Sequence, residues 1–212
     1  MVTFDCSLFQ VLLITSFIAY FNQTTLETTL TPFTTERFNW HEFEVSVLFA
    51  VAGVEITLVY IVLHFITKKF SDQSILLFGY VLLSIACLIG VIILPFADIG
   101  STKYLPIFLL FVALDILALP LIVVTTTSLF TQQTNHEQQG MGQGVQRFVI
   151  SVATVVGPLY AGILLQSTWA MLCSMLVIVV FATCLLLFVY RAFRSKTDDE
   201  LAALIAPVNT RP

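Results

Sequence analysis

The stretch ILLFGYVLLSIACLIGVIILP, residues 75–95, contains 21 residues and not one charge. A helix that crosses a membrane needs about 20 consecutive, mainly apolar residues. The apolar residues here follow one another without the every-second-residue alternation of a strand in a membrane barrel. Helices also satisfy their own backbone hydrogen bonds, as hydrocarbon requires. This stretch therefore predicts a membrane-spanning helix.

Five further stretches of the chain have the same character. The six predicted spans are Phe9–Leu30, Phe43–Ile66, Ile75–Pro95, Tyr104–Phe130, Val145–Gln166 and Trp169–Tyr190. They cover most of the 212 residues and leave little sequence for a soluble domain. We predict an all-α, polytopic membrane protein, with a helical bundle over residues 1–192 and a polar tail over residues 193–212.

Composition supports a membrane protein and excludes several other classes. Hydrophobic residues make up 58% of the chain and charged residues 10%, whereas soluble domains average about 45–50% and about 25%. Such a chain would expose too much apolar surface to remain a soluble monomer. The net charge of -4 argues against a partner that is a nucleic acid. We expect the lipid bilayer to be the main partner.

The three histidines, His41, His64 and His136, are scattered over different loops and span ends. No pair has the spacing of metal ligands, and no Ser–His arrangement suggests an intramembrane protease. We therefore expect neither an enzyme nor a bound metal or cofactor.

Basic residues are distributed unequally between the two ends of the predicted spans. One side has Lys68, Lys69, Arg147, Arg191, Arg194, Lys196 and Arg211, and the other has Arg37 and Lys103. Basic loops face the cytosol in most membrane proteins. This distribution predicts that both termini are cytosolic.

The first span carries a polar face. Ser16, Tyr20, Gln23 and Glu27 are spaced four, three and four residues apart, and positions three or four apart share one face of a helix. Such a face either borders a hydrated cavity or packs against another helix.

Two further acidic residues lie near the centres of spans, Glu55 in the second and Asp115 in the fourth. An ionised side chain at that depth costs about 2.5–3.5 kcal/mol on insertion scales. Pro120 removes the helical donor for the carbonyl of Ile116, next to Asp115. Broken helices beside intramembrane acids form the binding sites of many transporters. The alternative is an ordinary kink beside an acid without a role.

The fifth span carries a second polar face and a row of small residues. The polar face consists of Gln143, Arg147, Ser151 and Thr154. The small residues are Ala153, Gly157 and Ala161, and such a row allows a neighbouring helix to approach closely. Pro158 is expected to bend the span.

The tail contains an acidic dileucine pattern, formed by Glu200, Leu204 and Ile205. Patterns of this kind are addresses read by sorting receptors. The tail is either a signal for endosomes and lysosomes, read by a sorting adaptor, or a simple amphipathic end of a helix.

Six spans with cytosolic termini and a Gly-Pro pair in the fifth span resemble one half of a major facilitator superfamily transporter. The residues that carry the resemblance are Glu27–Pro32, Gly53-Val54-Glu55, Lys68-Lys69, Ile75-Leu76-Leu77, Gly79, Gly142 and Gly157-Pro158. Within that superfamily the chain is most similar to the lysosomal branch linked to neuronal ceroid lipofuscinosis, the major facilitator superfamily domain-containing protein 8 type.

The resemblance implies a fold and a function. The superfamily has two six-helix halves, each an inverted 3+3 repeat, and this chain resembles the second half. We expect transport of a small solute or anion across an endolysosomal membrane, by alternating access or a channel-like pathway. Tyr20, Gln23, Glu27, Glu55, Asp115, Arg147 and Ser151 would line that pathway. Pro120, Gly157 and Pro158 would bend or pack the helices.

Six helices provide one wall of such a cavity, so we expect a missing N-terminal half or a second copy as a partner. The alternative function is a membrane adaptor that transports nothing and acts through helix contacts and its tail.

Overall fold

The chain is described by a computed structural model over residues 6–94, 102–133, 139–165 and 167–205. Side chains are described over residues 9–94, 103–132, 139–165 and 167–190. These residues form α-helices and one short 3₁₀ helix, and the described part of the chain contains no strand. The helices are α1 (Cys6–Phe38), α2 (Glu42–Ile66), α3 (Asp72–Ile93), η2 (Thr102–Tyr104), α4 (Leu105–Gln133), α5 (Gln139–Leu164) and α6 (Thr168–Ile205).

Each predicted span corresponds to one α-helix, and the all-α fold is confirmed. Among the described residues, α2, α3, α4, α5 and α6 are long and apolar enough to cross a membrane. α1 has 33 residues, which is more than the length that a span requires. It is the most polar of the six, because threonine, asparagine and glutamine side chains occupy much of its middle.

Three helices extend beyond the predicted spans by more than one turn. α1 continues past Leu30 and through Pro32 to Phe38, and it ends where Asn39 adopts a left-handed conformation with φ of 53°. Asparagine tolerates that conformation better than most residues do. α5 begins at Gln139, so Arg147 lies about two turns inside the helix. α6 continues as helix through the predicted tail to Ile205.

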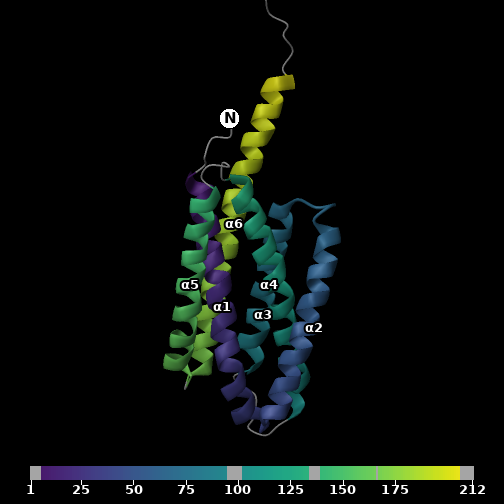
Figure 1. Ribbon diagram of the computed structural model, residues 1–212, viewed down its shortest axis with the longest axis vertical. Coiled ribbons are helices and arrows are strands. Elements are labelled where there is room, and N and C mark those ends of the chain that lie inside the picture. Colours follow the sequence, from purple (N-terminus) through teal and green to yellow (C-terminus); the bar gives the residue numbers. More distant parts are fainter. Residues whose placement is uncertain (1–5, 95–101, 134–138, 166, 206–212) are drawn as a thin grey trace, which may run out of the picture.

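The helices form two layers (Figure 1). α5, α1, α4 and α2 follow one another across the front of the bundle, and α3 and α6 lie behind them. The main helix contacts come in equivalent pairs. Replacing α1, α2 and α3 by α4, α5 and α6, and the reverse, turns each contact into its counterpart. α1 packs on α5 as α4 packs on α2, and α3 packs on α4 as α6 packs on α1. This exchange is what a 3+3 repeat requires.

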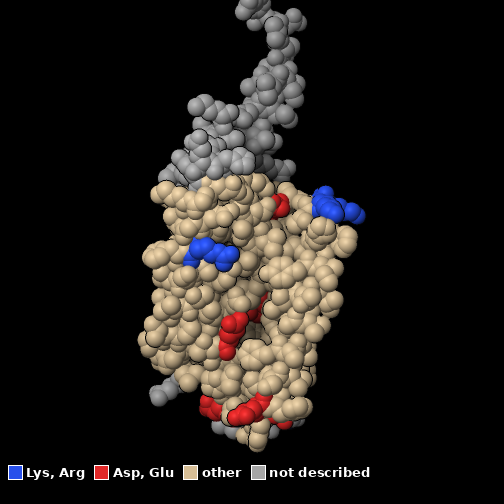
Figure 2. All heavy atoms as spheres, in the orientation of Figure 1, with Lys and Arg blue, Asp and Glu red and all other residues tan. Residues whose placement is uncertain are grey.

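Charges distinguish the two ends of the bundle. α1 begins, α6 ends and the α2–α3 turn lies at one end (Figure 1), and Lys68 and Lys69 belong to that turn. Acidic side chains gather at the opposite end (Figure 2), where α1 meets α2 and the sequence carries Glu36, Glu42 and Glu44.

The contact between α1 and α5 depends on small side chains. Ala153, Gly157 and Ala161 of α5 are all buried. Thr25 of α1 donates a hydrogen bond from Oγ1 to the Gly157 carbonyl over 3.3 Å. A Cβ on Gly157 would lie 2.1 Å from Thr24 Oγ1 and 3.1 Å from the Phe21 carbonyl oxygen. The two backbones therefore approach too closely for any side chain at residue 157.

We predict that Gly157→Ala destabilises the bundle, because the added methyl group meets the Thr24 hydroxyl group and the Phe21 carbonyl oxygen of α1. Overpacking of this kind costs roughly 1–3 kcal/mol. Gly162→Ala on the same helix is the matched control, since a Cβ there meets nothing within 4 Å. Thermal unfolding of the purified chain in detergent micelles measures both variants. Equal midpoints for the two variants would contradict this account of the α1–α5 contact.

Candidate functional site

A cavity of about 170 Å³ opens between α1, α2 and α4. Figure 2 shows acidic side chains in a hollow at mid-height of the face where these helices lie, far from the acidic end of the bundle. Three polar side chains line the cavity, Gln23 and Glu27 from α1 and Asp115 from α4. The other lining residues are Leu26, Leu30, Leu48, Phe49, Ala52, Gly53, Ile56, Phe111, Val112, Ile116 and Leu119.

Asp115 is the most deeply placed charged group of the cavity, with 5% of its surface exposed. Asn22 of α1 donates a hydrogen bond from Nδ2 to Asp115 Oδ1 over 3.1 Å. The thiol of Cys87 on α3 donates to Asn22 Oδ1 over 3.8 Å. All three residues are buried. A cluster from three helices therefore fixes the orientation of the Asp115 carboxyl group.

Glu27 lies one turn after Gln23 on the same face of α1. Gln23 donates from Nε2 to Glu27 Oε1 over 2.8 Å. The Glu27 side chain is exposed, and Gln23 is half-buried. Both residues were predicted from the polar face of the first span, and the structure brings them together with Asp115.

The rest of that polar face points elsewhere. Ser16 is buried and accepts a hydrogen bond over 3.5 Å from Gln146 Nε2 on α5, so this part of the face packs against a helix. Tyr20 is half-buried and does not line the cavity. The Ser16 end of this face therefore packs against α5, and Gln23 and Glu27 line the cavity.

Glu55, Arg147 and Ser151 are not lining residues of the cavity. Glu55 is half-buried on α2 beside the lining residue Ile56. Arg147 and Ser151 are exposed on α5, and the Ser151 hydroxyl donates to the Arg147 carbonyl over 2.9 Å. Figure 2 shows a basic side chain over α5 on the same face as the acidic hollow and nearer the end that carries Lys68 and Lys69.

Arg147 lies at a different level from the acids. Its neighbour Gln146 contacts Ser16, and Ser16 is eleven residues before Glu27 on α1. At 1.5 Å per residue, Ser16 lies about 16 Å along the helix from Glu27 and about 9 Å from Asn22, the partner of Asp115. The fixed positive charge is therefore not a partner of the cavity carboxylates.

Both prolines lie inside continuous helices, Pro120 in α4 and Pro158 in α5. Pro120 is buried one residue after Leu119, which lines the cavity. Pro158 follows Gly157 at the contact with α1. The backbone of Glu200, Leu204 and Ile205 is helical, and their side chains lie outside the described part of the chain.

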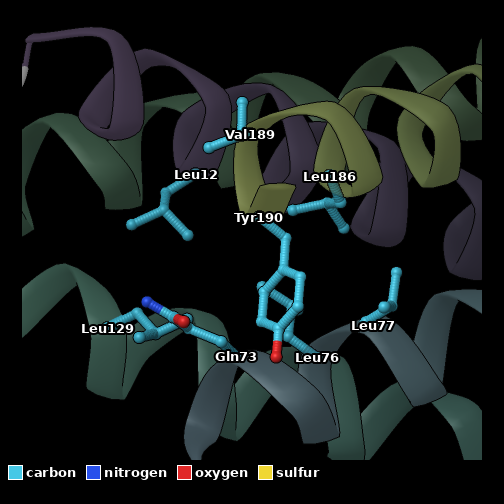
Figure 3. Close-up of a pocket in the computed structure, with 8 residues that line it drawn as sticks. All are labelled: Leu12, Gln73, Leu76, Leu77, Leu129, Leu186, Val189 and Tyr190. Atoms are coloured by element: carbon cyan, nitrogen blue, oxygen red, sulfur yellow. The ribbon is translucent and has the colours of Figure 1, made fainter. Parts of the chain in front are cut away.

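A second cavity lies where α1, α3, α4 and α6 meet (Figure 3). Its volume is about 30 Å³, roughly the share of one water molecule in the liquid. Leucine and valine side chains and Gln73 surround it, and the Tyr190 ring extends across it from α6. Its size and apolar lining make it a packing gap and not a solute site.

Asn22 and Cys87 belong to the site but were not predicted from the sequence. Asn22 is one position from Gln23, outside the four-three-four spacing of the polar face, and its partner Asp115 is 93 residues away. Cys87 lies in an uncharged stretch and has the appearance of an apolar residue. A buried asparagine in a span was the available signal, since it requires partners.

Comparison with known families finds that the family model described as Major Facilitator Superfamily matches residues 12–210. No curated protein matches the chain.

We predict that Asn22→Leu destabilises the chain by about 1–3 kcal/mol, because Asp115 Oδ1 loses its donor in a buried site. The double variant Asn22→Leu/Asp115→Leu should lose less than the sum of the single variants. Couplings between helices in membranes average about 0.6 kcal/mol and reach about 1.7 kcal/mol. Unfolding by SDS titration in mixed micelles measures this cycle. For the control pair Glu36→Gln/Asn22→Leu, the losses in free energy of unfolding should add. If the losses of Asn22→Leu and Asp115→Leu also add, the proposed coupling between these two residues is contradicted.

Proposed function

The chain belongs to the major facilitator superfamily, and from this premise we propose that it moves a small solute through the cavity between α1, α2 and α4. Members of this superfamily are membrane transporters, and the six helices of this chain fit one half of their fold. The mechanism that we propose is alternating access, in which two halves rock about a site near the middle of the membrane.

One observation carries this proposal. Two acidic side chains, Glu27 of α1 and Asp115 of α4, line one cavity. An ionised group near the centre of a span, as Asp115 is in the fourth predicted span, costs about 2.5–3.5 kcal/mol on insertion scales. Packing alone gains little from them, since an interhelical hydrogen bond in a membrane averages about 0.6 kcal/mol. Water or a solute in the cavity accounts for their position.

The cavity lies within one half-bundle, and alternating access requires a second half. Its lining comes from α1, α2 and α4 in the front layer of the bundle. The outer helices of that layer, α2 and α5, have exposed apolar side chains, among them Val51, Leu58, Val152 and Val155. We propose that a second six-helix half, on an N-terminal segment or on another copy of the chain, faces this layer.

The remaining predicted residues have supporting roles in this proposal. Tyr20 and Glu55 border the route to the cavity, and Arg147 and Ser151 lie on the same layer nearer the cytosolic end. Gly157 holds α5 against α1, and Pro120 and Pro158 weaken the backbone of α4 and α5 where they bend as the halves move.

We also propose an endolysosomal membrane as the location, with both termini in the cytosol, and membership of the branch linked to neuronal ceroid lipofuscinosis. The support is the sequence pattern of Glu200, Leu204 and Ile205 beyond the apolar stretch Thr168–Tyr190 of α6, together with the basic residues at that end of the bundle.

We predict that Glu27→Gln and Asp115→Asn each reduce solute flux by about tenfold or more. Hydrogen bonds to charged groups are worth about 1.5–3 kcal/mol, and 1.36 kcal/mol corresponds to tenfold in rate. The assay is uptake of radiolabelled sugars, amino acids, monocarboxylates and amines into proteoliposomes that contain the purified chain with its partner half. Both substitutions are isosteric, so the fold should persist.

Glu36→Gln is the matched control, since it neutralises an exposed acid near the end of the same helix. Its flux should stay within about twofold of the wild type, because surface substitutions perturb little. Flux that is absent for every solute, or equal in all three variants, would refute the pathway and favour the membrane adaptor.

We predict that Leu204→Ala/Ile205→Ala moves a fluorescently tagged chain from lysosomes to the plasma membrane, because the sorting pattern is lost. Leu201→Ala in the same tail is the control and should keep the original location. Confocal microscopy with a lysosomal marker measures the overlap. An unchanged distribution of the double variant would contradict the sorting role.

A further inference from the structure

We propose that the cavity between α1, α2 and α4 binds a small organic cation with an apolar body, such as an arylalkylammonium ion. This inference rests on the proposed transport function and specifies its substrate class. Four features of the described residues support it. They are the acidic character of the charged lining residues, the free oxygen of the Asp115 carboxylate, the distance of Arg147 from the cavity, and the apolar walls.

The charged residues that line the cavity are both acidic. Glu27 and Asp115 come from different helices, and the remaining polar lining residue is the neutral amide of Gln23. No lysine, arginine or histidine is among the lining residues. An anion placed here would meet two carboxylates without a counter-charge, whereas a cation would neutralise them. Like charges within a few ångströms repel strongly where water is scarce.

Asp115 has an oxygen available to a ligand. Its carboxyl group is almost completely buried, at 5% exposure, and it lines the cavity. In the described part of the chain, its hydrogen bond is the one that Asn22 donates to Oδ1. Carboxylate oxygens accept several hydrogen bonds, so Oδ2 is left for a donor inside the cavity. An ammonium group supplies such donors together with the charge.

Arg147 does not convert the cavity into an anion site. It lies about 16 Å along the bundle from Glu27 by the helical rise between Ser16 and Glu27. Its guanidinium group belongs to α5, and α5 contributes nothing to the lining. Figure 2 shows the basic group over α5 and the acidic hollow as separate patches. The field inside the cavity is therefore set by the two carboxylates.

The apolar walls determine the rest of the ligand. Leucine, isoleucine and valine side chains from three helices surround the acids, together with Phe49 and Phe111. The volume of about 170 Å³ is close to that of engineered apolar cavities of about 150 Å³ that bind benzene. Aromatic rings also attract cations over their faces. A ring-sized apolar body with a short ammonium arm fits this combination.

The test is binding of tritiated 2-phenylethylamine, which is a cation at neutral pH, to the purified full chain in lipid nanodiscs. Two neutral or anionic compounds of similar shape, 2-phenylethanol and 3-phenylpropionate, compete in the same assay. Empty nanodiscs correct for partition into lipid. We expect saturable binding of the amine and at least tenfold weaker competition by the alcohol and by the carboxylate.

Variants locate the bound amine. Glu27→Gln and Asp115→Asn should each weaken binding at least tenfold, and Asn22→Leu should weaken it through the orientation of Asp115. Glu36→Gln should bind as the wild type does. Amine binding that is absent, equal in all variants, or displaced better by 3-phenylpropionate would overturn the cation assignment.

The flux assay separates this inference from the function on which it rests. If another solute crosses the membrane in a manner that depends on Glu27 and Asp115 while the amine does not bind, the pathway stands and the substrate class is wrong. If neither flux nor amine binding occurs, both proposals fail.

Discussion

The buried carboxyl group of Asp115 is the constraint on which the rest of the bundle depends. A carboxylate that is 5% exposed in the middle of an apolar helix requires a donor, and Asn22 supplies it from α1. Cys87 of α3 then contacts the same asparagine. One polar cluster thus fixes the relative position of three helices, two of which line the cavity. The hydrogen bonds that stabilise the buried Asp115 side chain therefore also position the helices that line the cavity.

The composition of α1 follows from this central position. α1 contacts α4, α5 and α6, so a wholly apolar helix would offer no donor to Asp115 and a bulky one would not fit against Gly157. Asn22 meets the first need. Threonines meet the second, because Thr24, Thr25 and Thr29 donate their hydroxyl groups to carbonyls one turn earlier in the same helix. The side chains are then internally satisfied and small enough for close packing.

The sequence predicted the helices well and the site in part, for a physical reason. Length and apolarity locate a span without knowledge of its neighbours, and the spacing of Gln23 and Glu27 places them on one face. Spacing does not show which neighbouring helix a polar face contacts. Glu55 was therefore grouped with Asp115, although Glu55 does not line the cavity. The sequence also does not show at what height along the bundle a residue lies, and Arg147 was grouped with Glu27, which lies about 16 Å away along the axis. The contact of Asn22 with Asp115 joins positions 93 residues apart and requires the fold.

The cavity has one firmly held wall and one loosely held wall. α1 and α4 are tied by the buried cluster and packed against α3 and α6. α2 packs mainly against α4, and its buried residues are Val45, Ala52 and Leu63. Elements with few buried apolar contacts move at the lowest free-energy cost. A ligand that touches both walls would therefore change the position of α2 more readily than that of α1 or α4. The carboxylates that attract the ligand stand on the firm wall, so the charge stays in place while the apolar side of the cavity closes around it.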